Sequence, residues 1–81
     1  MARAPETGFY FEPLSERLAL LIAGSAFPSE EAWAYVGNPA EMSLDVACLE
    51  VATRWPGVDP ESLVLELDPA AKGTDATSRN R

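Results

Sequence analysis

The chain has 81 residues, of which 47% are apolar, so it can form one small domain with a core of its own, and disorder throughout is excluded. Thirteen acidic residues against six lysines and arginines give a formal net charge of −7, which opposes direct binding to a nucleic-acid backbone. The chain has no histidine and a single cysteine, which excludes Ser-His, Cys-His and His-metal sites and any intrachain disulfide.

The two ends differ in composition from the segment between them. Residues 1–7 are small and polar and include a proline, and residues 69–81 contain too few large apolar side chains to form a core. We therefore predict a flexible N-terminal arm over residues 1–7, a single helical domain over residues 8–68 and a flexible C-terminal tail over residues 69–81.

Two short helices are predicted in the first half of the domain. The first begins near Pro13, a residue suited to the first helical position, carries leucines at helical spacing and ends at Gly24. The second follows Ser29 as its N-cap and ends at Gly37. Its first turn is acidic, as the helix dipole favours.

The third predicted helix has the clearest sequence pattern. Asn38 as N-cap, Pro39 at the first position and Glu41 three residues after the cap form a capping-box arrangement. One broad face of this helix is apolar, and it is made of Leu44, Ala47, Cys48, Val51, Ala52 and Trp55. The opposite side of this helix is polar, and it is flanked by the further apolar residues Met42, Val46 and Leu49. So much apolar surface indicates a central helix with contacts on more than one side.

Residues 60–67 allow two interpretations. Asp59 and Pro60 resemble an N-cap and a first helical residue, which favours a fourth helix through Leu67. Leucines at 63, 65 and 67 alternate with other residues, which favours a strand pairing with residues 9–12. The predicted fold class is mostly α: a small compact bundle of three to four short helices around the central third helix, with a minor two-stranded element (9–12 with 63–67) as the alternative.

No residue pattern indicates catalysis, a cofactor or a metal. Cys48 lies on the apolar face of the third predicted helix, where it packs as a small hydrophobe, and the five glycines are scattered, so no phosphate-binding loop is present. We therefore expect no enzymatic activity.

The aromatic residues exceed the obvious needs of the core, and aromatic side chains often anchor interfaces. The candidate protein-binding residues are Glu30, Glu31, Trp33, Tyr35 and Tyr10.

These features favour a small acidic module that binds a partner protein with a basic surface and acts as an inhibitor, adaptor or assembly accessory factor. The alanine-rich, lysine-poor composition indicates a GC-rich genome, bacterial or phage. No secretory signal or membrane span is recognised, so the expected location is the cytoplasm, without membrane or direct nucleic-acid contact. The alternatives are a structural subunit of a larger assembly such as a virion, and an acidic nucleic-acid mimic that blocks a DNA- or RNA-binding protein. A homodimer through the third helix is a further expectation.

Overall fold

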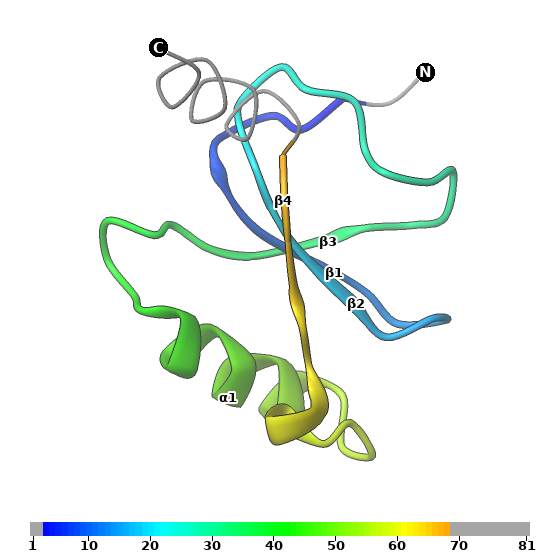
Figure 1. Cartoon of the computed structure of the whole chain (residues 1–81), viewed down its shortest axis with the longest axis vertical. Coiled ribbons are helices and arrows are strands. Elements are labelled where there is room, and N and C mark those ends of the chain that lie inside the picture. Colours follow the sequence, from blue (N-terminus) through cyan, green and yellow to red (C-terminus); the bar gives the residue numbers. More distant parts are fainter. Residues whose placement is uncertain (1–2, 69–81) are drawn as a thin grey trace, which may run out of the picture.

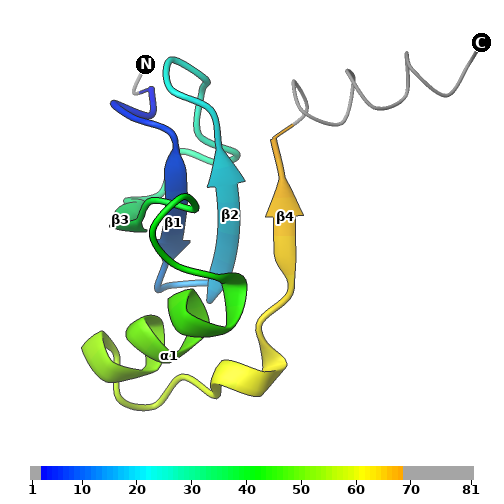
Figure 2. The same ribbon diagram turned by 90° about the vertical axis from the view of Figure 1, so that its left-hand side faces the viewer.

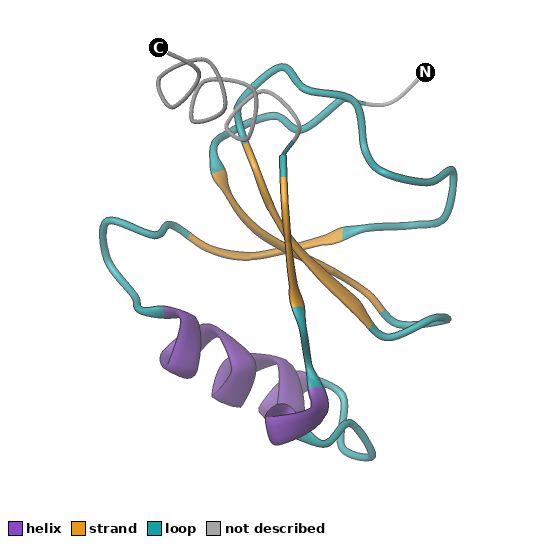
Figure 3. Ribbon diagram, viewed as in Figure 1, coloured by secondary structure: helices purple, strands orange, loops and turns teal. Residues whose placement is uncertain are grey.

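The computed structural model describes residues 3–68, which form a mixed α/β fold with one α-helix beside a four-stranded sheet (Figures 1 and 3). In chain order, the elements are β1 (Gly8–Glu12), β2 (Arg17–Leu21), β3 (Ala34–Gly37), α1 (Leu44–Arg54), the 3₁₀ turn η1 (Pro60–Ser62) and β4 (Leu65–Leu67). The predicted mostly helical bundle is therefore wrong.

The strands lie in the order β3-β1-β2-β4. β1 pairs antiparallel with both of its neighbours, Phe11 opposite Leu18 of β2 and Tyr10 opposite Tyr35 of β3. β4 pairs parallel to β2, with Leu65 opposite Leu18. Figure 2 shows β4 at the edge of the sheet beside β2, on the side away from β3.

The main core fills the space between one face of the sheet and α1. It contains the buried residues Phe9, Phe11, Leu18, Val36, Ala47, Cys48 and Val51. Phe11 contacts Trp55 at the end of α1, with ring centroids 4.8 Å apart. Because Ala47, Cys48 and Val51 share one side of the helix, α1 buries that side and leaves Val46 and Leu49 exposed.

Within the described residues, no helix covers the other face of the sheet. Its buried residues Ala4, Tyr10, Ala19 and Leu21 pack against Phe27, Trp33 and Tyr35. Phe27 and Trp33 belong to the long segment between β2 and β3, and their rings stack nearly parallel at 6.4 Å. A loop with two aromatic side chains thus takes the place of a second helical layer.

The first two predicted helices are replaced by strands. Residues 13–16 form the tight turn between β1 and β2, in which the Glu12 carboxylate accepts hydrogen bonds from the backbone N–H of Leu14 at 2.5 Å and of Ser15 at 2.9 Å. The Ser15 hydroxyl donates to the same carboxylate, and Glu16 has a positive φ of 57°. These turn contacts end β1 and place Leu18 and Leu21 on a strand. In the second segment, Ser29 caps no helix, and residues 34–37 form β3.

The third helix is confirmed, but it begins later than predicted. Asn38 begins a turn instead, in which its side chain accepts a hydrogen bond from Ala40 N–H at 2.7 Å. The N-cap is Ser43, whose hydroxyl accepts from Val46 N–H at 3.3 Å. The capping-box pattern therefore marked the turn before the helix.

The fourth helix is wrong, and the strand alternative is confirmed in part. Asp59 does cap a helical turn, since its carboxylate accepts from Glu61 N–H at 3.0 Å, but the turn ends at Ser62. β4 follows, as the alternation of leucines predicts. Its partner is β2, whereas residues 9–12 form β1, which pairs with β2 and β3.

Candidate functional site

The two predicted acidic contact residues lie together on an exposed loop. Glu30 and Glu31 are both exposed in the segment between β2 and β3. Trp33 of the same segment is half-buried, and its indole N–H donates to the Ser29 hydroxyl at 3.1 Å. The Arg17 guanidinium lies over the Trp33 ring, 5.4 Å from its centroid. Much of the Trp33 surface is therefore engaged in holding the loop on the sheet.

Tyr10 and Tyr35 lie at the sheet and contact each other, with ring centroids 5.4 Å apart. Tyr10 is buried, and its hydroxyl donates to the carbonyl oxygen of Glu6 at 2.7 Å. Burial raises the pKa of both phenols above the usual range. Tyr35 is half-buried. The structure thus separates the five predicted residues into two exposed carboxylates and three aromatics that pack against the sheet.

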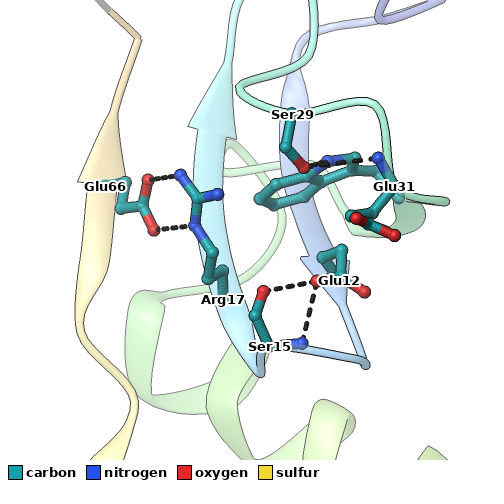
Figure 4. Close-up of polar contacts among 7 residues, drawn as sticks. Glu12, Ser15, Arg17, Ser29, Glu31 and Glu66 are labelled. Carbon is teal, nitrogen blue, oxygen red and sulfur yellow. Dashed lines mark hydrogen bonds and ion pairs between the residues drawn. The ribbon is translucent and has the colours of Figure 1, made fainter.

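Arg17 joins β2 to β4 across the same face (Figure 4). Its Nε and Nη2 atoms donate to the two carboxylate oxygens of Glu66 at 2.8 and 2.7 Å, a two-point ion pair. The hydrogen bonds from Arg17 lower the pKa of Glu66, and the same contact raises the pKa of Arg17. This pair holds the edge strand in place.

A second surface is formed where η1 packs against α1. A hollow of about 430 Å³ opens there, lined by Leu44, Asp45, Cys48, Leu49, Pro60, Glu61 and Leu63. We call it the α1–η1 groove. Two of its leucines are accessible, with Leu44 39% and Leu49 59% exposed. The groove therefore offers an apolar floor bordered by the carboxylates of Asp45 and Glu61.

The charge around this groove is strongly negative. Residues 3–68 carry twelve acidic side chains and three arginines, a net formal charge of −9. Each arginine is engaged within the domain: Arg17 with Glu66, Arg54 with Glu50 at 2.7 Å, and Arg3 with the carbonyl oxygen of Gly24 at 2.8 Å. Neither Asp45 nor Glu61 forms an ion pair with any residue in 3–68.

The groove has little capacity for covalent or metal chemistry. Cys48 is buried, and burial together with the nearby Asp45 raises the pKa of its thiol, so the sulfur stays protonated and poorly nucleophilic at neutral pH. Within residues 3–68 no group of three or more Cys, Asp or Glu side chains is arranged to hold a metal ion. The same part of the chain contains no helix long and apolar enough to cross a membrane. What the groove offers is apolar contact combined with negative charge.

A smaller hollow lies on the opposite face of the sheet. It has a volume of about 410 Å³ and is lined by Ala19, Leu21, Ala26, Phe27, Pro28, Glu66 and Leu67. Its one carboxylate, Glu66, is already bound to Arg17. The α1–η1 groove therefore has the stronger combination of accessible apolar surface and available charge.

Comparison with protein-family models, with curated proteins and with solved structures finds no match for this chain. Its site is therefore identified from geometry and charge.

The sequence did contain a signal for the groove. The third helix has more apolar residues than one buried side requires, and Leu49 is among them. The contribution of Pro60, Glu61 and Leu63 could not be recognised, because it depends on how η1 folds back against α1.

Proposed function

We propose that this protein is a non-catalytic binding module, and that its α1–η1 groove takes a segment of another protein bearing both apolar and basic side chains. The observation that carries the proposal is the groove itself, where accessible leucines and two carboxylates border one hollow.

The apolar part of the groove supports a contact surface. Leu44 and Leu49 are accessible side by side with the half-buried Leu63. Burying such a surface against a partner is favourable in proportion to the apolar area removed from water. Interfaces typically place an apolar centre inside a polar rim, and Asp45 and Glu61 provide such a rim.

The charge supports a basic partner. With a net charge of −9 over residues 3–68, the domain attracts positively charged surfaces and repels acidic ones. Lysine or arginine beside the partner's apolar residues would pair with Asp45 and Glu61. Such rim pairs chiefly increase the rate of association and its dependence on salt.

Site-specific crosslinking in the native host tests the position of the partner. A photoreactive benzoylphenylalanine is introduced at Leu49 of the full chain, and in a matched control at Leu14, which is exposed but lies in the β1–β2 turn. We expect a crosslinked partner from position 49 and not from position 14. The crosslinked partner peptide is expected to contain lysine or arginine next to apolar residues.

Binding constants with that purified partner then test the chemistry. Leu49→Ser is expected to weaken binding by about fivefold or more, as for a central interface contact, whereas Leu14→Ser leaves it unchanged. The double variant Asp45→Lys with Glu61→Lys should slow association and reduce its salt dependence. The matched control is the double variant Glu30→Lys with Glu31→Lys, which changes the net charge by the same amount as the groove variant but on a loop outside the groove.

The opposite pattern would contradict the proposal. If the variant of Glu30 and Glu31 abolished binding while the groove variants bound normally, the partner would dock on the loop between β2 and β3. The residues first predicted from the sequence would then form the site.

A further inference from the structure

The two edges of the sheet differ, and the difference bears on how a partner binds. At one edge, the guanidinium of Arg54 donates to the carbonyl oxygens of Tyr35 at 2.8 Å and of Val36 at 3.2 Å. Because adjacent carbonyls of a strand point to opposite sides, one of these two faces outward, and a side chain from α1 occupies an acceptor that β3 would otherwise offer to another strand. The β3 edge is therefore partly occupied from within the domain.

Within residues 3–68, no strand pairs with the outer edge of β4. Asp68 N–H donates to Leu20 O at 3.0 Å, so β4 directs the backbone groups of Glu66 and Asp68 toward β2. Because successive residues of a strand direct these groups to opposite sides, Leu65 and Leu67 direct their N–H and C=O groups outward. No residue within 3–68 forms a hydrogen bond with those outward groups. Among the described residues, two donors and two acceptors are thus left for an added strand.

The surroundings of β4 are apolar, and they continue into the groove. Val64 is 77% exposed and Leu67 43% exposed. Leu63, two residues before β4, lines the α1–η1 groove, whereas Leu67 at the other end lines the smaller hollow on the opposite face. A strand beside β4 would place successive side chains on alternate faces, so it could use both hollows.

We infer that the partner segment binds as an extended strand that pairs with the outer edge of β4 and directs an apolar side chain into the α1–η1 groove. This rests on the proposed function and specifies its mode of binding. The occupant is a strand of another protein in which apolar residues alternate with lysine or arginine. Its backbone supplies hydrogen bonds to Leu65 and Leu67, and its apolar side chains face the α1–η1 groove. Its basic side chains lie on the other face of the strand and are attracted by the net charge of −9 over residues 3–68.

Charge disfavours a second copy of this chain as the occupant. Two chains of net charge −7 repel each other, and pairing through β4 would bring the acidic borders of both grooves together. A basic segment gains from the same charges. The partner is therefore expected to be a different protein.

Hydrogen exchange of the full-length chain provides the first test. In the free protein, the amides of Leu65 and Leu67 should exchange faster than that of Glu66, which points toward β2. The probe is a capped seven-residue peptide of alternating lysine and valine, and it should slow exchange at Leu65 and Leu67 selectively. Slow exchange at both positions in the free monomer, or an unchanged rate with saturating peptide, would overturn the inference.

Two methylated peptides separate strand pairing from other contacts. One carries N-methyl groups on every valine nitrogen and the other on every lysine nitrogen, so each blocks one edge of the peptide. Strand pairing predicts that one isomer binds at least about tenfold more weakly than the unmodified peptide, while the other binds nearly as well. Equal affinities for the two isomers would exclude strand addition, as would absence of binding by the unmodified peptide.

The outcomes also distinguish this inference from the proposed function. If crosslinking at Leu49 succeeds but both methylated isomers bind equally well, the groove remains the binding site and pairing of the partner with β4 is excluded. Light scattering that shows a dimer of the free chain, broken by substitution of Leu67→Lys, would assign the edge to a second copy instead.

Discussion

Leu14 and Leu18 distinguish a strand hairpin from a helix. On the helix predicted over residues 13–24, the two leucines would lie four residues apart on the same face and would be buried to a similar extent. In the structure, Leu18 is 0% exposed in β2, whereas Leu14 is 81% exposed in the turn. Their truncation to alanine should therefore have very different consequences.

The cost of Leu18→Ala follows from its position. Leu18 lies opposite Phe11 on one side and Leu65 on the other, within the core beneath α1. Removing a fully buried leucine side chain costs about 2 to 5 kcal/mol, and the paired strands on both sides limit how far the site can collapse, so we expect roughly 3 kcal/mol. Leu14→Ala should change the free energy of unfolding by less than about 0.5 kcal/mol.

Urea denaturation followed by tryptophan fluorescence measures both variants under the same conditions. With a slope of about 1 kcal/mol per M, typical of small domains, Leu18→Ala should lower the midpoint by roughly 2 to 3 M, or prevent folding altogether. The Leu14→Ala midpoint should match that of the parent chain. Equal losses in both variants would refute the hairpin and restore the helix.

Three further predictions concern the turn, the helix and the sheet. Burial of Glu12 opposes ionisation, but hydrogen bonds from Ser15 and Leu14 outweigh it and lower the carboxyl pKa below its usual value of 4.5. The stabilisation from these hydrogen bonds is therefore present above pH 4.5 and is lost as the pH falls through the lower pKa of the folded state. Glu12→Gln should accordingly be less stable than the parent at pH 7, and the difference should shrink toward pH 3; a constant difference across urea titrations at both pH values would contradict this. Ser43→Ala removes the N-cap of α1 and should lower the free energy of unfolding by about 1 kcal/mol. Thermal denaturation measures this loss, and an unchanged melting temperature would contradict the prediction. Gly8→Ala would place a Cβ atom 2.7 Å from the carbonyl oxygen of Gly37 and against the Tyr35 ring, costing about 1 to 3 kcal/mol. In Gly37→Ala the nearest atoms to the new Cβ belong to the flexible Met42 side chain, so this variant should cost less.

The first half of the fold was mispredicted because local signals there favour a helix. Leucine and alanine are strong helix formers, and the run Arg17–Leu21 shows no clean alternation of apolar and polar residues. β2 lies between β1 and β4 and is buried on both faces, so alternation is lost. The decisive information was the turn at residues 13–16, where Glu12 acts as a local hydrogen-bond acceptor.

The later elements were more readable. The apolar spacing of 3.6 over residues 44–54 predicted the helix, although the cap predicted at Asn38 belongs to the turn before it. In β4, the alternation of leucines indicated a strand, but a local pattern does not specify which strand lies beside it. The same limit applies to the groove, since Leu49 could be identified as surplus apolar surface but its proximity to Glu61 is a tertiary contact.

The clamp of Arg54 on β3 limits what can be built from this domain. A sheet with two accessible edges can recruit one molecule after another and polymerise into a filament, since every addition exposes a fresh edge. Here the guanidinium of Arg54 occupies backbone acceptors of β3, which hinders the addition of a strand at that edge. If a partner strand adds to β4 as proposed, Arg54 disfavours a second addition at β3, and Arg54→Ala is expected to make the domain more prone to assembly through that edge.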